Sequence, residues 1–230
     1  NSSNSELTGS EALVRWYNEE CGMLFPNEFI PVFENNGFIV ELDEYMFEHV
    51  CMDIRKWLDS GYNVVPVSVN MSQLQLYNSR FIEEYIAILK KYDVPAEYIQ
   101  LEMTETTLFS ETDALIDTID KLHKAGFKIL MDDFGTGYSS LNMLKSIPVD
   151  ILKLDKSFVD DIGDSKGDIV VSTIVSLGQL LNMKIVAEGV ETKEQYEFLR
   201  DIFCDEIQGY YFSRPISSEE YIKKMTKGAL

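Results

Sequence analysis

The sequence predicts an α/β fold in which parallel strands alternate with helices. Short apolar runs rich in β-branched residues alternate along the chain with longer segments of helical composition. This alternation is typical of βαβ units that share a parallel sheet. No linker rich in Pro, Ser or Gly interrupts the chain after Ser10. We therefore expect a polar lead-in over residues 1–10 and one domain over residues 11–230.

The expected elements follow one another at regular intervals. Strands are expected over residues 11–16, 64–69, 99–103, 127–131, 151–154, 184–187 and 207–212. Helices are expected over residues 29–60, 79–92, 111–125, 168–182, 193–202 and from residue 217 onward, with a short helix before Pro148. An Asn-Asn-Gly sequence at residues 35–37 interrupts the first helix, and Gly126 ends the third, since glycine favours helix ends.

Five consecutive strands carry a polar residue at or just beyond their carboxyl ends. These residues are Asn70, Glu102, Asp132, Lys153 and Glu188. An unpaired buried charge is costly, and the usual compensation is an ion pair or a metal. In a (β/α)8 barrel the carboxyl ends of the strands hold the active site, and closure would bring these residues to one centre. A doubly wound open sheet is the alternative, but it would keep the outer charges apart.

The residue types at these positions suit a hard metal ion. Glu11, Asn70, Glu102 and Asp132 offer oxygen donors, which favour Mg²⁺ or Mn²⁺ over zinc. Asp133 could hold a second ion, and two ions about 3.5–4 Å apart clamp both oxygens of a phosphoryl displacement. Lys153 could offset developing negative charge or orient the attacking water. Glu188 is a candidate general base for that water.

Structural interpretations of the same residues stay open at this point. Glu11 could pair with an arginine, Asn70 could cap a strand end, and Lys153 could simply neutralise an acid. Glu105 and Glu191 are more easily explained as loop supports or surface acids than as ligands. The aromatic residues 210–212 could stack on a base or belong to the core.

Composition excludes several classes of function. The chain of 230 residues carries a formal net charge of −19, which argues against binding to a nucleic-acid polymer. Cations in a site could still attract a phosphorylated ligand. Three widely spaced cysteines suggest neither a disulfide framework nor a zinc site. No apolar run approaches a membrane span and no signal peptide is visible. We expect a cytoplasmic domain without membrane contact, although upstream segments could anchor a full-length protein.

Seven motifs, taken in order, give the chain a resemblance to EAL domains, the bacterial family of cyclic di-GMP phosphodiesterases. They are EALVR (11–15), SVNMS (68–72), LEMTE (101–105), DDFGTGYSSL (132–141), LKLDKSFV (152–159), AEGVET (187–192) and QGYYFSRP (208–215). The resemblance implies a modified (β/α)8 TIM barrel with one antiparallel strand. It also implies hydrolysis of cyclic di-GMP to linear pGpG with Mg²⁺ or Mn²⁺, bound as two ions. The alternatives are a cyclic di-GMP receptor without turnover and a pure interaction module.

The resemblance also assigns roles to individual residues. Glu11, Asn70, Glu102 and Asp132 match the ligands of one metal, and Asp133 matches a ligand of the second. Lys153 and Glu188 match the lysine and the base that act on water, Glu105 matches the acid that supports the DFGTG loop, and Glu191 matches a further site acid. The positions that match substrate contacts are Leu13, Arg15, Gln208, Tyr211, Phe212 and Pro215.

Two expectations concern what lies around the domain. The family's first strand, with its YQP-type motif, has no counterpart in the residues before EALVR, so we expect that strand to be missing from this sequence. The resemblance further suggests a homodimer and an upstream GGDEF or sensory domain.

Overall fold

Seven strands form one sheet in the computed structural model, which describes residues 1–4, 6–20, 22–109, 112–135 and 141–227. The strands lie in the order β1-β4-β5-β6-β7-β8-β9, and every neighbouring pair is parallel. Their bounds are β1 Ser10–Ala12, β4 Val67–Asn70, β5 Ile99–Thr104, β6 Lys128–Phe134, β7 Ile151–Leu154, β8 Lys184–Ala187 and β9 Glu206–Ile207. The expected α/β barrel class is confirmed. The antiparallel strand that the resemblance implies is not among these seven.

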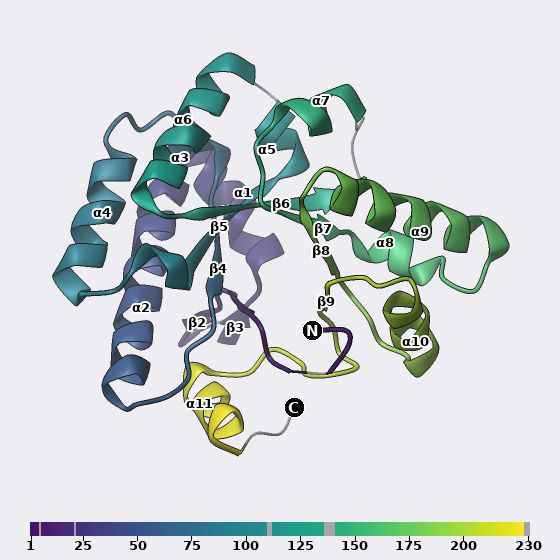
Figure 1. Cartoon of the computed structure of the whole chain (residues 1–230). Coiled ribbons are helices and arrows are strands. Elements are labelled where there is room, and N and C mark those ends of the chain that lie inside the picture. Colours follow the sequence, from purple (N-terminus) through teal and green to yellow (C-terminus); the bar gives the residue numbers. More distant parts are fainter. Residues whose placement is uncertain (5, 21, 110–111, 136–140, 228–230) are drawn as a thin grey trace.

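Helices surround the outside of the strands in Figure 1. The longer ones are α1 Pro26–Asn36, α2 Ile39–Asp59, α4 Phe81–Tyr92, α6 Thr112–Ala125, α9 Ser165–Leu180, α10 Lys193–Asp201 and α11 Ser218–Lys227. Short helices α3 Gln73–Leu76, α5 Glu105–Phe109, α7 Leu141–Ser146 and α8 Lys156–Asp160 lie between them, with a 3₁₀ turn over Ala96–Tyr98. In the described part of the chain, no helix combines the length and the apolar composition that a membrane crossing requires.

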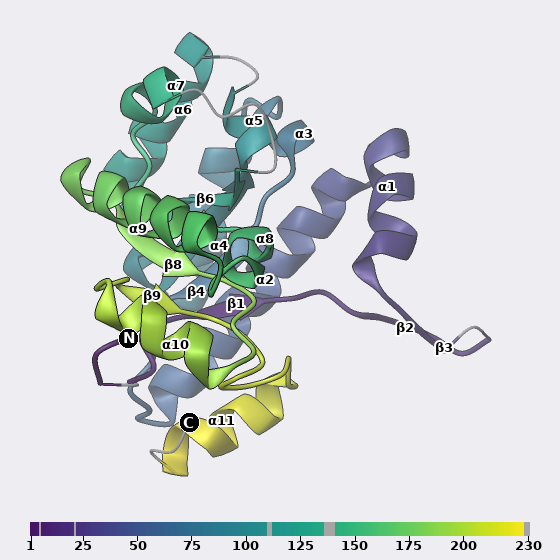
Figure 2. The ribbon, with the colours of Figure 1, turned by 90° about the vertical axis from the view of Figure 1, so that its right-hand side faces the viewer.

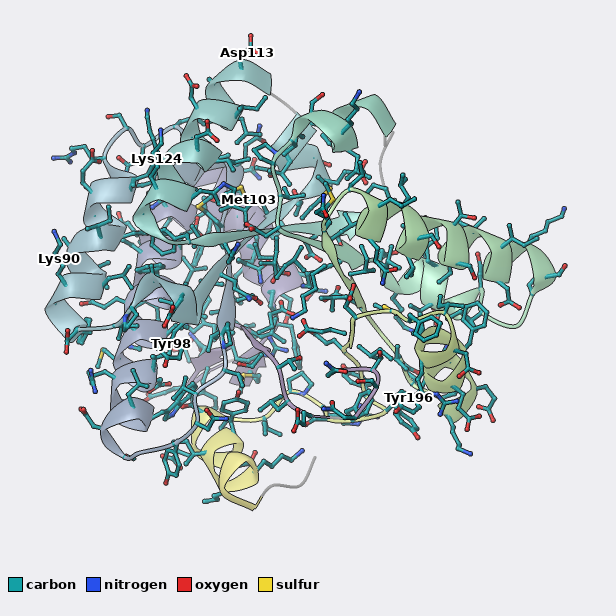
Figure 3. The ribbon with its side chains drawn as sticks, viewed as in Figure 1. Lys90, Tyr98, Met103, Asp113, Lys124 and Tyr196 are labelled. Carbon is teal, nitrogen blue, oxygen red and sulfur yellow. The ribbon has the colours of Figure 1, made fainter. Side chains whose placement is uncertain are left out.

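The two faces of the sheet have different cores. Strand side chains that face the helices, such as Leu101, Met103 and Leu152, are fully buried in one large cluster. In Figure 3, Met103 lies in the interior of the molecule, whereas Asp113 and Lys124 lie on α6 at its surface. On the inner face, Leu130, Ile151 and Val186 form a separate small cluster. Because strand residues alternate, this inner layer shares its face with Asp132, Lys153 and Glu188.

The sheet curls until side chains from its two ends meet. Gln208, just after β9, donates from Nε2 to Oε2 of Glu11 on β1 at 2.8 Å. Near the other end of the strands, the backbone N–H of Ser2 donates to the carbonyl of Asp205 at 3.2 Å. These contacts bring together the first and last strands of the spatial order, which excludes the doubly wound alternative.

Two expected strands end earlier in the structure than the sequence suggested. The chain leaves the sheet after Ala12, and Trp16–Asn18 (β2) pairs antiparallel with Gly22–Leu24 (β3) in a separate hairpin. Trp16 packs there against Phe29 and Phe33 of α1. Figure 2 shows this hairpin and α1 standing away from the strands.

The last strand covers Glu206–Ile207 and not residues 207–212. Beyond it the chain crosses over Val190, whose N–H donates to the carbonyl of Gln208 at 3.1 Å and whose carbonyl accepts from Tyr211 at 2.9 Å. A Cβ atom at Gly209 would lie 2.1 Å from the carbonyl oxygen of Val190, so only glycine permits this close approach.

Candidate active site

Six strand ends bring six polar side chains to the same end of the barrel. They are Glu11 on β1, Asn70 on β4, Glu102 on β5, Asp132 on β6, Lys153 on β7 and Glu188 after β8. The register places Asn70 directly beside Glu102 and puts Asp132 two residues further along, beside Thr104, on the face that Glu102 shares. The parallel pairing thus converts residues far apart in the sequence into one cluster at the carboxyl ends, where barrels of this kind hold their sites.

Lys153 lies at the centre of this cluster. Its Nζ atom contacts Oε1 of Glu102 and lies 2.7 Å from Oε1 of Glu188. Asp132 Oδ1 is 3.3 Å away and Glu11 Oε2 is 3.6 Å away. The Lys153 side chain is 3% exposed and that of Glu102 is fully buried. Four carboxylates therefore surround one buried ammonium group.

Burial and the surplus of negative charge together shift the pKa values of the cluster. Burial raises the pKa of Glu102 well above its usual range, and Glu11 and Asp132 add to this rise against the opposing effect of Lys153. Burial likewise raises the pKa of Glu188 to about 7. Burial alone would lower the pKa of Lys153, but the surrounding carboxylates outweigh it and raise the value. The lysine therefore stays charged, and the site still favours additional positive charge.

Two amide side chains orient Glu11. Asn70 donates from Nδ2 to Oε1 of Glu11 at 3.1 Å, and Gln208 donates to the other oxygen, Oε2. Since an amide nitrogen cannot bind a cation, Asn70 retains only its oxygen as a metal donor. Gln208, expected as a substrate contact, in addition links the end of β9 to the acidic cluster.

An irregular strand end places Asp133 beside Asp132. The pairing of β6 with β7 shifts register between Met131 and Phe134, and Asp133 has a φ of 55°. Positive φ is uncommon outside glycine and clusters at functional sites. Burial raises the pKa of Asp133, and Asp132 and Asp155 raise it further. Asp155 lies within the LKLDKSFV motif, but no feature of the motif singles it out as a site residue.

Glu105 lies just beyond the cluster and contacts the loop after β6. It is 2% exposed, and its Oε2 accepts a hydrogen bond from the backbone N–H of Gly135 at 2.7 Å. A Cβ atom at Gly135, where φ is 100°, would lie 2.1 Å from the Phe158 ring. Within the DFGTG loop and just beyond it, we expect Glu105 to reach Thr136, Ser139 or Ser140, and these three residues lie outside the described ones.

Several expected site residues are exposed or contact residues outside the cluster. The side chain of Glu191 is 48% exposed and its Oε1 lies 3.4 Å from Nζ of Lys156. Leu13 is 41% exposed, and the Arg15 guanidinium lies 5.9 Å from the ring centre of Phe25. Pro215 is exposed. The contacts of Lys153 therefore unite the four carboxylates of the cluster and do not include these flanking positions.

Tyr211 and Phe212 form an aromatic group with Tyr196 of α10, which Figure 3 labels. Tyr211 stacks on Tyr196 with ring centres 5.5 Å apart, and Phe212 meets Tyr196 edge-on at 5.6 Å. The backbone bonds to Val190 hold this group next to the loop that carries Glu188.

The cluster has the composition of a divalent cation site. Glu11, Glu102 and Glu188 each present an oxygen, and these oxygens lie within 4.8 Å of one another. The second oxygen of Glu102, Oε2, is buried and has no hydrogen-bond partner among the described residues. A buried carboxylate oxygen without a partner is costly, and a hard cation would satisfy it. The residues present therefore fit Mg²⁺ or Mn²⁺.

Comparison with known proteins identifies relatives of both the sequence and the fold. The chain is 38% identical over 220 residues to the "Bifunctional diguanylate cyclase/cyclic di-GMP phosphodiesterase MucR" of Pseudomonas aeruginosa, a match that covers 95% of this chain and 32% of that protein. It is 37% identical over 216 residues to the "Oxygen sensor protein DosP" of Escherichia coli, covering 94% and 27%. This chain thus spans about a third or less of the length of these relatives.

A solved structure agrees with these sequence relatives. The "PaMucR Phosphodiesterase, c-di-GMP complex" superposes with a TM-score of 0.87 at 39% identity, covering 92% of this chain and 86% of that one. The sequence model of the EAL domain matches residues 1–215. The chain belongs to the EAL domain family.

Proposed function

We propose that this chain hydrolyses cyclic di-GMP to linear pGpG and needs Mg²⁺ or Mn²⁺ to do so. The observation that carries the proposal is the buried ammonium of Lys153 among four carboxylates, with an oxygen of Glu102 left without a partner among the described residues. Relatives named as cyclic di-GMP phosphodiesterases support the choice of substrate.

The acidic side chains would hold the metal ions. Glu11, Asn70, Glu102 and Asp132 would bind one ion, and Asp133 would bind a second. When bound, the cations neutralise charge on the phosphate and favour loss of a proton from water. A chain with a net charge of −19 could then accept an anionic dinucleotide.

Glu188 would accept the proton of the attacking water. The water oxygen forms a bond to phosphorus, the bond from phosphorus to the 3′ oxygen breaks, the leaving 3′ oxygen takes up a proton from solvent, and the ring opens to pGpG. The proton of the attacking water goes to the Glu188 carboxylate. A pKa raised to about 7 matches a general base that works near neutral pH.

Lys153 supplies fixed positive charge beside that carboxylate. Its Nζ atom lies 2.7 Å from Glu188 and contacts Glu102, so it favours the ionised form of the base before each turnover. The same ammonium group would stabilise the negative charge that develops on the phosphate during the reaction.

Residues at the rim would bind the nucleotide. We propose this role for Leu13, Arg15, Gln208, Tyr211, Phe212 and Pro215, and a supporting role for Glu191. Leu13 and Tyr211 expose apolar and aromatic surface that can pack on a guanine base.

The decisive experiment combines product analysis with binding on one preparation. Purified protein is stripped with EDTA, supplied with Mn²⁺ and cyclic di-GMP, and sampled by ion-exchange chromatography. We expect stoichiometric conversion to pGpG. Calorimetry with Ca²⁺ in place of Mn²⁺ reports binding separately. Binding without product would instead indicate a receptor, and a lack of binding would indicate an interaction module.

We also propose that this domain works within a larger regulated protein, as a homodimer. The relatives' names include a diguanylate cyclase and an oxygen sensor, and this chain matches only part of each. Light scattering of the purified chain tests the dimer, with a monomer mass contradicting it.

A further inference from the structure

A buried acid outside the site holds the turn that follows Asn70. Asp43 lies on α2 and is 6% exposed. Its Oδ2 accepts hydrogen bonds from the backbone N–H of Ser72 at 2.9 Å and from the Ser72 hydroxyl at 2.5 Å. Ser72 is the N-cap of α3, and its Oγ accepts from the N–H of Gln75. One carboxylate thus fixes the residue that starts α3.

The turn is held from two directions. Met71 donates its N–H to the carbonyl of Glu102 on β5 at 2.8 Å, while Ser72 is bonded to α2 through Asp43. Asn70 directly precedes this pair and reaches Glu11 with its amide nitrogen. The backbone on the carboxyl side of Asn70 is therefore fixed both to the sheet and to the outer helix.

Burying the carboxylate of Asp43 lowers the stability of the fold, so the hydrogen bonds to Ser72 call for a functional explanation. Burial raises its pKa to about 6, and the hydrogen bonds from Ser72 oppose that rise. An apolar residue of similar volume at such a site is often neutral or stabilising. Asp43 itself has apolar neighbours, since the buried rings of Phe47 on α2 and Tyr85 on α4 stack on each other nearby.

We propose that Asp43 is a positioning residue for the cation site, because its bonds to Ser72 set the position of the Asn70 amide. The inference rests on the proposed function only in assuming that the acidic cluster binds a divalent cation. Asp43 does not touch the cluster itself. Loss of the link should let the turn after β4 relax and weaken cation binding.

The test measures Mn²⁺ binding by electron paramagnetic resonance in the absence of nucleotide. Asp43→Ala should weaken Mn²⁺ binding about tenfold, within the range seen for residues that orient metal ligands. Asp43→Asn keeps an acceptor oxygen for Ser72 and should restore most of the affinity. At saturating Mn²⁺, Asp43→Ala should keep its turnover within about twofold of wild type.

Glu48→Ala is the matched control. Glu48 also lies on α2 and also links that helix to a neighbour, accepting from Lys91 at 2.6 Å and Tyr92 at 2.8 Å on α4. This variant should change thermal stability without changing Mn²⁺ affinity. Equal losses in both variants, or unchanged affinity in Asp43→Ala, would overturn the proposal.

A second variant covers the case in which Asp43→Ala does not fold. Ser72→Ala removes the hydroxyl bond and keeps the backbone bond to Asp43, so a smaller loss of Mn²⁺ affinity is expected. Unchanged affinity in Ser72→Ala would then overturn the role. If wild-type protein binds no Mn²⁺, the cation site fails together with the inference, whereas failure of the variants alone leaves the proposed function standing.

Discussion

The Nζ atom of Lys153 lies 2.7 Å from Oε1 of Glu188, at the ends of the neighbouring strands β7 and β8. Both side chains are largely buried, at 3% and 18% exposure. In such surroundings each charge depends on the other, since removing one partner of a buried pair leaves an uncompensated charge. The same pair joins the proposed base to the group that keeps it ionised.

Removal of the ammonium should therefore disable the site. We expect Lys153→Met to lower kcat by roughly 10²–10³-fold, the usual effect of losing one preorganised electrostatic group. In EDTA it should also melt at a lower temperature than wild type at pH 8, because the carboxylates then repel one another. Lys184→Met, which loses a partly exposed pair with Glu206, is the control. Near-native turnover in Lys153→Met would show that the Lys153 ammonium group does not contribute to catalysis.

Replacement of the base should separate chemistry from binding. Glu188→Gln keeps the shape of the side chain but cannot accept a proton at neutral pH, so turnover should fall about 10²–10⁴-fold. Cyclic di-GMP should still bind, as measured by calorimetry. Glu197→Gln, which removes a surface pair with Lys193, should leave both quantities unchanged. If Glu188→Gln keeps most of its activity, another group activates the water.

Stability of the metal-free protein should fall as pH rises from about 4.5 to about 7. The pKa of Glu188 is raised from 4.5 to about 7, so within this window the folded state binds more protons than the unfolded state. Stability then decreases with pH, by roughly 1.4 kcal/mol for each unit of pKa shift. Urea titrations in EDTA should show a shallower fall for Glu188→Gln than for wild type. Identical slopes would contradict the raised pKa.

Glu105→Ala should act through the loop after β6. Loss of the bond to the N–H of Gly135 should displace the neighbouring carboxylates Asp132 and Asp133. We expect a higher Mn²⁺ concentration at half-maximal rate and a lower kcat, with the far-ultraviolet circular dichroism spectrum unchanged. Glu105→Gln, which keeps an acceptor oxygen, should recover part of the loss. A metal titration of Glu105→Ala that overlays the wild-type curve would show that the loop needs no such support.

The strands could be predicted because their signals are local. Residues 151–154 and 184–187 match the bounds of β7 and β8, since short apolar runs bounded by helices leave little choice of where a strand begins and ends. The short helices α3, α5 and α8 were not expected, because four or five residues are too few to show a helical period. The aromatic content of residues 207–212 is typical of strands and predicts one there, but the chain passes over Val190 at Gly209, a tertiary contact that no local pattern shows.

The charged centre of the site could also be predicted, since a charge at the end of an apolar strand costs stability unless a partner or a metal compensates it. Lys153 and its four carboxylates did come together as expected. The role of Gln208 as a link to Glu11 could not be predicted from the sequence, because the two residues meet only when the sheet curls. The role of Asp43 could not be predicted either. In the sequence it is one of several acids on α2, and only the fold brings Ser72 into contact with it.

The most direct test of the central claim is the initial rate of pGpG formation against Mn²⁺ concentration, using EDTA-stripped protein and cyclic di-GMP. If the cluster around Lys153 is a cation-dependent hydrolytic site, the rate should be near zero without Mn²⁺ and rise to saturation as it is added. A rate that is independent of Mn²⁺, or cyclic di-GMP that stays intact at every concentration while binding to the protein, would contradict it.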